Sequence, residues 1–169
     1  AAGCTTNTSY TCVDRHVQAG RGSTTAIIFE PNDPADSSSR TTITYEELLV
    51  RVKAFAVTLR SAGVRVGDVV TIYMPMVPDL PVAMLACARI GAVHSVVFGG
   101  FSAESLAGRI RDAQSTCIVT CDAVYRGAKL IHLKSTVDAA IDICSKPSAI
   151  LPAVEISSVF VLERVGREV

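Results

Sequence analysis

The chain has 169 residues, of which 49% are hydrophobic and 19% charged, and its 16 Lys and Arg residues balance its 16 Asp and Glu residues. A disordered tail is excluded because this much apolar material can bury a core, and the length fits one domain or a part of one. The zero net charge, the 5% aromatic content and the absence of Trp argue against nucleic-acid binding and against attraction to an anionic membrane surface.

The first part of the chain predicts a helix, a strand and a loop. A helix is expected over residues 9–18, and a strand over residues 25–30, where branched side chains are frequent. Residues 31–40 contain two prolines and three serines, which is typical of an exposed loop.

A second helix is predicted to begin after Thr44. Thr44 and Glu47 have the spacing of a capping box, in which each side chain bonds a free backbone N–H group at the helix start. Gly63 is expected to end this helix. Within this helix, apolar residues recur at steps of three and four and predict one buried stripe: Leu48, Leu49, Val52, Phe55, Ala56 and Leu59.

The middle of the chain predicts a central strand and a buried helix. Residues 69–73 (VVTIY) carry no charge and are β-branched or aromatic, as in an interior strand. Residues 74–81 contain three prolines and predict a turn, and residues 82–90 predict a helix that Gly91 ends.

The rest of the chain continues to alternate strands with helices. A strand is expected over residues 93–98, and Ser102 is expected to cap a helix that runs to Ala113. Further elements are predicted at residues 117–120 (strand), 130–144 (helix) and 159–162 (strand). This alternation predicts the α/β class, with an open, mostly parallel sheet flanked by helices.

The most apolar stretch, residues 80–101, is not expected to span a membrane. Arg89 lies near its centre and the Gly99-Gly100 pair interrupts it, and a charged residue there is costly in a bilayer. A buried strand and helix of a soluble protein explain this stretch better.

The six cysteines are interpreted as buried, reduced thiols rather than as disulfides or metal ligands. No two of them form a CxxC motif, and several lie in apolar periodic segments. Reduced thiols favour a reducing compartment. We therefore expect a cytoplasmic protein, with the mitochondrial matrix as the alternative.

Two junctions between predicted elements are candidate ligand sites, because ligands of parallel sheets collect where strands end. At residues 97–102 (VFGGFS), two glycines would let a ligand approach the backbone beside a helix start; the alternative is a sharp turn without a ligand. At the second junction, Arg126 and Lys129 are three residues apart. At a helix start they would lie on one side and could grip a phosphate, although a solvated helix end has the same pattern.

Other site motifs are missing. The sequence contains no phosphate-binding P-loop, no G-x-G-x-x-G order and no G-x-S-x-G nucleophile turn. His16, His94 and His132 lack the spacing of metal ligands. No resident metal site is expected in the chain.

Several longer segments, taken together, resemble one enzyme family. The segments are Asp14-Arg15-His16, residues 44–48 (TYEEL), Gly67-Asp68, residues 74–78 (MPMVP), residues 83–104 (AMLACARIGAVHSVVFGGFSAE) and residues 126–129 (RGAK). On these segments the chain resembles the AMP-forming acetyl-CoA synthetases of the adenylate-forming superfamily, from about Asn7 to the end of the 130–144 helix.

The resemblance implies a two-step ligase. Acetate attacks ATP to give acetyl adenylate and pyrophosphate, and the thiol of coenzyme A (CoA) then displaces AMP. In this family the nucleotide end of CoA lies against the FGGFS and RGGK-like segments. The resemblance therefore implies a CoA-binding role for Gly99, Gly100, Arg126, Gly127, Ala128 and Lys129. Ala128 stands where the family usually has glycine.

The resemblance also implies that residues 1–169 are a partial N-terminal, large domain without a complete second domain. The family's ATP-binding residues, Mg²⁺ ligands and adenylating lysine would follow Val169, so no catalytic residue is assigned and the chain alone is expected to be inactive. Uncovered apolar faces, on the helices around residues 82–90 and 137–144, would then favour self-association.

Three other functions stay open. A propionyl-CoA or other short-chain acyl-CoA synthetase would share the same front part. A noncatalytic module could bind CoA or another nucleotide through Arg126 and Lys129. A nicotinamide-dependent oxidoreductase fits the alternating elements but lacks the required glycine fingerprint.

Overall fold

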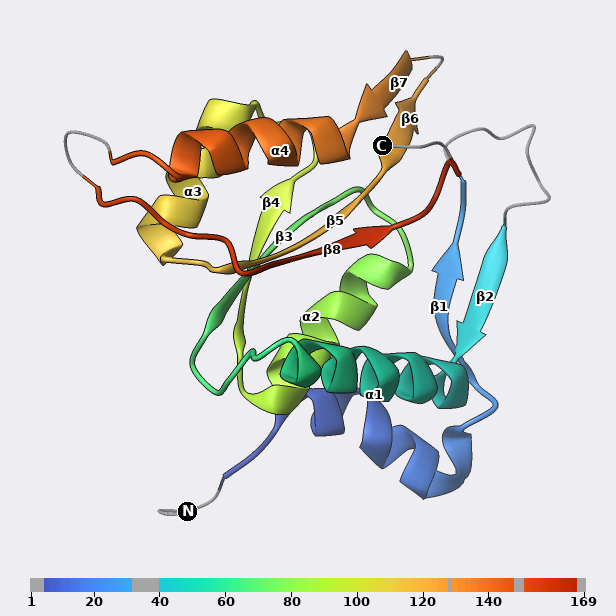
Figure 1. The fold of residues 1–169 in the computed structure, drawn as a ribbon. Coiled ribbons are helices and arrows are strands. Elements are labelled where there is room, and N and C mark those ends of the chain that lie inside the picture. Colours follow the sequence, from blue (N-terminus) through green and yellow to red (C-terminus); the bar gives the residue numbers. More distant parts are fainter. Residues whose placement is uncertain (1–4, 32–39, 128, 148–150, 167–169) are drawn as a thin grey trace. The chain divides into compact units, whose positions relative to one another are not determined.

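The computed structural model describes residues 5–31, 40–127, 129–147 and 151–166, which fall into two compact units (Figure 1). The first unit comprises residues 1–67 and 77–92, and the second comprises residues 68–76 and 93–169. Each unit has its own buried hydrophobic core.

The second unit is built on a four-stranded parallel sheet in the order β4-β3-β5-β8. β3 (Val69–Met74) and β5 (Cys117–Cys121) are the interior strands, while β4 (Val93–Phe98) and β8 (Ser158–Leu162) form the edges. Every residue of β5 is buried, as expected for an uncharged strand inside a parallel sheet. The predicted α/β class and the central position of residues 69–73 are thereby confirmed.

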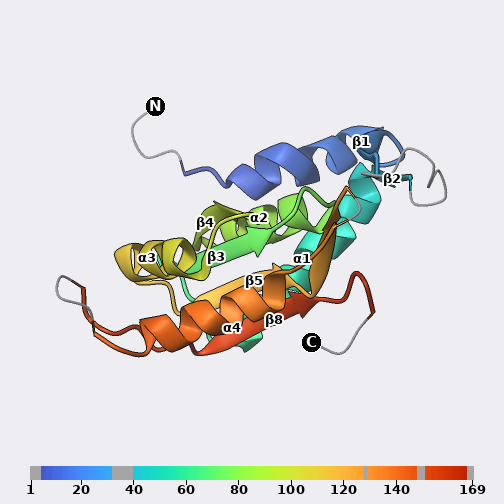
Figure 2. The ribbon, with the colours of Figure 1, turned by 90° about the horizontal axis from the view of Figure 1, so that it is seen from above.

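Two helices, α3 (Ala103–Ala113) and α4 (Leu133–Cys144), pack against each other on one face of this sheet (Figure 1). Seen from above, α4 lies over β5 and α3 lies toward β4 (Figure 2). The predicted cap is confirmed, because the Ser102 hydroxyl accepts a hydrogen bond from the backbone N–H of Ser105. Apolar residues of α3, α4 and the sheet together form the core of this unit, including Leu106, Ile110, Ile118, Leu133, Val137, Ala140 and Cys144.

The segment between β5 and α4 differs from the prediction. It forms an antiparallel pair, β6 (Ala123–Arg126) and β7 (Lys129–His132), so the helix predicted over residues 130–144 begins only at Leu133. Gly127 has a φ of 60°, the left-handed conformation that a tight turn between two strands requires. The helical periodicity of the following residues hid this short pair.

The first unit contains two packed helices, α1 (Tyr45–Ser61) and α2 (Asp79–Ile90). The Thr44 and Glu47 capping box is confirmed at the start of α1, with both reciprocal hydrogen bonds present. In the predicted stripe, Leu48, Val52, Ala56 and Leu59 are buried, and Leu49 and Phe55 pack at its border.

Two predictions for the first unit need correction. β1 (Thr25–Phe29) does not join the parallel sheet; it pairs antiparallel with β2 (Thr41–Thr44), a strand that the sequence did not reveal. The loop predicted at residues 31–40 lies almost wholly outside the described residues. Helix α2 begins at Asp79 and not at residue 82, because Pro81 falls in its first turn, where the missing N–H has no partner to lose. Gly91 ends α2 with a φ of 77°, as predicted.

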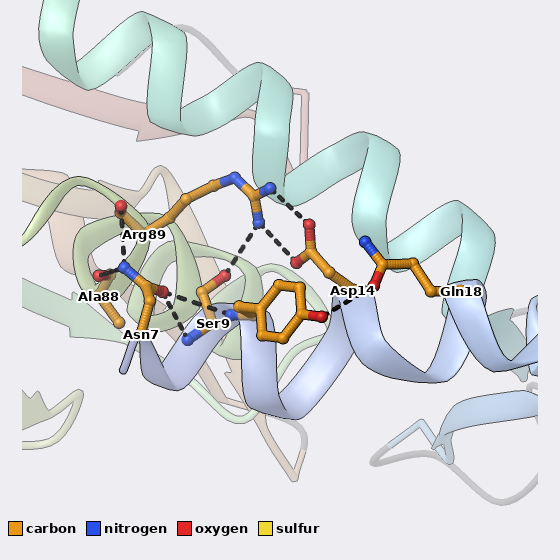
Figure 3. Close-up of polar contacts among 7 residues, drawn as sticks. Asn7, Ser9, Asp14, Gln18, Ala88 and Arg89 are labelled. Atoms are coloured by element: carbon orange, nitrogen blue, oxygen red, sulfur yellow. Dashed lines mark hydrogen bonds and ion pairs between the residues drawn. The ribbon is translucent and has the colours of Figure 1, made fainter. Parts of the chain in front are cut away.

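The N-terminal segment is tied to the last turn of α2 (Figure 3). It is helical over residues 8–21 apart from a kink at Gly20, whose φ is 75°, and it has wide π-type turns at η1 (Tyr10–Asp14) and η2 (Val17–Arg21). The segment thus extends the helix predicted over residues 9–18. The Asn7 amide donates to the backbone carbonyls of Ala88 and Arg89. Its oxygen accepts from the N–H groups of Ser9 and Tyr10. The Asn7 side chain therefore caps both the carboxyl end of α2 and the amino end of the N-terminal helix.

The cysteines agree in the main with their predicted state. Cys87, Cys117, Cys121 and Cys144 are buried, and none of the five described cysteines forms a disulfide. Cys12 is exposed, contrary to the prediction, and Cys4 lies outside the described residues. Burial raises the pKa of Cys121 to about 11, so this thiol stays protonated. None of the helices in the described part of the chain combines the length and apolarity needed to span a bilayer.

Candidate functional site

The carboxyl ends of β3, β4 and β5 define the candidate site. The chain forms β3, adds β4 on one side of it, and then places β5 on the other side. The strand order thus reverses around β3, and ligands of open parallel sheets bind outside the carboxyl ends at such a reversal. The glycine turn follows β4 and the β6–β7 pair follows β5, so both predicted junctions lie at this end of the sheet.

The Gly99-Gly100 turn is tight because of its neighbours. Neither glycine has a positive φ, so left-handed backbone does not explain them. A Cβ at Gly99 would lie 3.1 Å from Cδ2 of Leu133 and 3.4 Å from the carbonyl oxygen of Met74. A Cβ at Gly100 would lie 2.7 Å from Cε1 of Phe98, a distance that forces the ring to move. A side chain at either glycine would therefore have to displace a neighbouring side chain.

The structure brings the glycine turn and Arg126 together. Nη1 of Arg126 lies 3.3 Å from the position of a Cβ on Gly100. The guanidinium carbon of the same arginine lies 5.7 Å from the centroid of the Phe98 ring, in a cation–π arrangement. Two segments that are 26 residues apart in the sequence thus form one surface.

A second arginine and a second ring extend this surface. Phe98 and Phe101 meet edge to face with centroids 6.1 Å apart, and the guanidinium of Arg109 lies 5.0 Å from the Phe101 centroid. Phe98 is 58% exposed and Phe101 36%. The sequence reasoning missed Arg109, which lies on α3 rather than in either junction.

Arg126 and Lys129 are not at a helix start, so the predicted reason for their proximity is wrong. They are register partners at the end of the β6–β7 pair, and directly opposed residues of an antiparallel pair present their side chains on one face. Both residues are exposed. The strand pair therefore produces the arrangement that was expected from a helix. Gly127 lies in the turn between them, and Ala128 lies outside the described residues.

A buried carboxylate fixes the base of the β6–β7 pair. Asp122 is 2% exposed and accepts hydrogen bonds from the N–H groups of Ala123, Val165 and Gly166. Burial acts to raise the pKa of Asp122, but these backbone hydrogen bonds outweigh it and hold the pKa below its ordinary value. The carboxylate thus stays charged and joins β6 to the segment after β8.

A buried tyrosine of β3 is hydrogen-bonded to the glycine turn. Tyr73 of β3 is 1% exposed, and its hydroxyl donates a hydrogen bond of 2.8 Å to the carbonyl of Phe101. This residue was not predicted as part of the site. The signal was present, because a Tyr in an otherwise apolar strand needs a partner for its hydroxyl.

This arrangement can bind an anionic ligand. Guanidinium and ammonium groups form charge-assisted hydrogen bonds with phosphate, and two glycines leave the neighbouring backbone accessible. The partly exposed rings of Phe98 and Phe101 add apolar surface. Fold and site together define an α/β protein with a candidate phosphate-ligand surface at the carboxyl ends of its parallel strands.

Comparison with known proteins identifies the family. The sequence model of the family described as "AMP-binding enzyme" matches residues 14–159. The chain belongs to this AMP-binding enzyme family.

Curated relatives are identical to the chain at about half of the matched positions. An acetyl-coenzyme A synthetase of Rhizobium meliloti (strain 1021) is 51% identical over 164 residues, which are 97% of this chain and 24% of the relative. A chloroplastic/glyoxysomal acetyl-coenzyme A synthetase of Arabidopsis thaliana is 56% identical over 141 residues, 83% of this chain and 19% of the relative. The chain thus spans about a quarter of the length of the curated relatives it matches.

Proposed function

We propose that the chain is part of an AMP-forming acetate–CoA ligase. The reaction joins acetate and ATP into acetyl adenylate with release of pyrophosphate, and the CoA thiol then attacks the acyl carbon with release of AMP. Relatives named acetyl-coenzyme A synthetase, identical to the chain at about half of their matched positions, support the proposal. Residues 1–169 would form the first part of the large domain of such an enzyme, without a complete second domain.

Within this enzyme, the chain would contribute part of the CoA site. The proposed binding residues are Gly99, Gly100, Arg126, Gly127, Ala128 and Lys129. The observation that carries this proposal is the proximity of Arg126 to Gly100 at the carboxyl end of the parallel sheet. Arg126 and Lys129 would hold phosphate groups of CoA, and the turn would let the ligand approach the backbone.

The chain's own role is binding rather than bond making. Adenylation converts the carboxylate oxygen of acetate into part of a good leaving group, AMP, so the thiol needs to be held close to the acyl carbon. Anchoring the nucleotide end of CoA provides this positioning from a distance. The family also implies Mg²⁺ with ATP. Among the described residues, no cluster of three or more His, Cys, Asp or Glu side chains is placed to hold a metal ion. We propose no Mg²⁺ ligand in this chain, because the family resemblance implies that these ligands follow Val169.

Compartment and acyl specificity belong to the same proposal. We place the enzyme in the cytoplasm, which the four buried thiols and the bacterial relatives support; the mitochondrial matrix is the alternative. Acetate is favoured over propionate by the names of the relatives. Comparing kcat/KM for acetate and propionate tests the substrate, and a higher value for propionate would overturn it.

Replacing Arg126 in the full-length protein tests the CoA role. Loss of charge-assisted hydrogen bonds to phosphate should raise the KM for CoA about 10- to 100-fold in Arg126→Ala. Acetate-dependent exchange of pyrophosphate into ATP needs no CoA and should stay unchanged. Arg60→Ala, which removes an exposed arginine from the last turn of α1, serves as the control. An unchanged KM for CoA in Arg126→Ala would contradict the assignment.

The isolated chain separates an enzyme part from a binding module. We expect no pyrophosphate exchange from residues 1–169 alone and only weak CoA binding, because most of the proposed active site lies elsewhere. Tight binding of CoA by the isolated chain that Arg126→Ala abolishes would favour the noncatalytic module instead.

A further inference from the structure

The hydroxyl of Tyr73 connects the sheet to the glycine turn. The side chain is part of the buried core of the second unit, beside Val97 and Leu106. Its hydroxyl donates to the carbonyl of Phe101 over 2.8 Å. Burial raises the pKa of Tyr73, so the hydroxyl remains protonated, and remains a donor, throughout the physiological pH range.

The glycine turn needs an external restraint. Gly99 and Gly100 have no side chains to limit their backbone, and glycine loses more conformational freedom on ordering than other residues. Inside the turn, the N–H groups of Gly100 and Phe101 both donate to the carbonyl of Phe98, over 2.8 and 3.1 Å. Both bonds end at Phe98, the last residue of the edge strand β4, so they do not connect the turn to the interior strand β3. The bond from Tyr73 does, at the point where the turn passes into α3.

Tyr73 is itself held rigidly. It lies in an interior strand, opposite Val97 on one side and Thr120 on the other. The Thr120 hydroxyl donates to the Tyr73 carbonyl over 2.9 Å. The hydroxyl of Tyr73 is therefore a fixed donor on the sheet, and it bonds the turn at a residue 28 positions further along the chain.

We infer that Tyr73 is a positioning residue for the CoA site: it holds the backbone of residues 99–101 in its binding conformation before the ligand arrives. The inference rests on the proposed function. A ligand that meets an already ordered turn does not have to supply the free energy of ordering it. The hydroxyl would therefore act on CoA affinity without touching CoA.

Tyr73→Phe in the full-length protein tests this role, because only one oxygen atom is removed. The KM for CoA should rise about five- to thirtyfold, the range set by one lost hydrogen bond together with a less ordered turn. The kcat at saturating CoA and the CoA-independent pyrophosphate exchange should both stay within twofold of wild type. A purely structural role for the hydroxyl would not separate these readouts.

Ser115→Ala is the matched control. Ser115 is fully buried, accepts from the N–H of Thr71 and donates to the carbonyl of Val69. The substitution Ser115→Ala thus removes a buried hydroxyl at the opposite, amino end of the same strands. We expect Ser115→Ala to lower the melting temperature while the KM for CoA stays unchanged.

A second measurement uses the unmodified protein and does not depend on how the variant folds. Hydrogen exchange at the N–H groups of Gly100 and Phe101 should already be slow without CoA and should change less than about tenfold when CoA is added. Fast exchange that becomes slow only with CoA would overturn the inference, and so would a Tyr73→Phe enzyme with the wild-type KM for CoA. If the unmodified full-length protein shows no CoA-dependent acyl transfer, the proposed function fails first and the inference fails with it.

Discussion

Asp14 and Arg89 form a two-bond ion pair inside the first unit. The guanidinium donates to both carboxylate oxygens over 2.6 and 2.8 Å, and the Ser9 hydroxyl lies 3.3 Å from the same group (Figure 3). The side chains are 11% and 24% exposed, so water screens the pair only in part. The hydrogen bond from Arg89 is the main reason that the pKa of Asp14 lies below its ordinary value of 3.8.

Replacing Asp14 should reveal a pH-dependent contribution to stability. At pH 7, Asp14→Asn should lower the free energy of unfolding by about 1.5–3 kcal/mol, the range for hydrogen bonds to charged groups. Because the folded-state pKa is lowered, this contribution is present above pH 3.8 and is lost as the pH falls through the folded-state pKa. Urea unfolding at pH 7 and pH 3 measures the difference, which should shrink at pH 3.

Asp138→Asn provides the comparison for that prediction. Asp138 pairs with Lys134 one helical turn away, and its side chain is 53% exposed. Its replacement should change the unfolding free energy by less than about 0.5 kcal/mol. An equal effect of the two substitutions would show that the bidentate geometry at Asp14 contributes nothing special.

At the scale of elements, local signals set the helix ends well. The capping box at Thr44, the serine cap at Ser102 and the left-handed Gly91 act within a few residues of the chain, and the structure confirms all three. The strands β2, β6 and β7 were missed for the opposite reason. Each is only four residues long and is stabilised by a partner strand, so its own residues carry little signal.

Removing the threonine of the capping box should destabilise α1. Thr44→Ala loses the hydrogen bond to the N–H of Glu47 and should lower the unfolding free energy by about 1 kcal/mol. Thr58→Ala is the control within the same helix, since Thr58 is exposed and only bonds back to the Ala54 carbonyl; it should be neutral or slightly stabilising. Thermal unfolding of both variants tests this prediction, and equal losses would contradict it.

At the scale of the whole molecule, self-association stays a prediction, and the structure suggests a different physical basis for it. The residues around the two helices that were expected to be uncovered, such as Val82, Val137 and Cys144, are buried within their units. Exposed apolar side chains instead gather on the edge strand β4: Val93, Val96 and Phe98 are 54%, 43% and 58% exposed. An unprotected edge with apolar side chains is a site where a second copy of a chain can pair.

A charge on β4 should therefore reduce self-association of the isolated chain. Light scattering should show a mass that rises with concentration in the wild type and falls toward the monomer in Val96→Lys. Val50→Lys places the same charge at an exposed valine of α1 and should leave the mass unchanged. A concentration-independent monomer in the wild type would refute self-association altogether.

The sequence by itself determined the α/β class, most helix boundaries and the residues that the family resemblance points to, because periodicity, caps and turn glycines act locally. Only the tertiary structure decided that β1 pairs with β2 outside the parallel sheet and that Arg126 lies beside Gly100. The same holds for the strand pair through which Arg126 and Lys129 share a face. The tertiary structure also revealed Tyr73 and Arg109, whose roles depend on partners far away or on another element. Contacts between distant segments follow from strand order and packing, and no local pattern of residues encodes them.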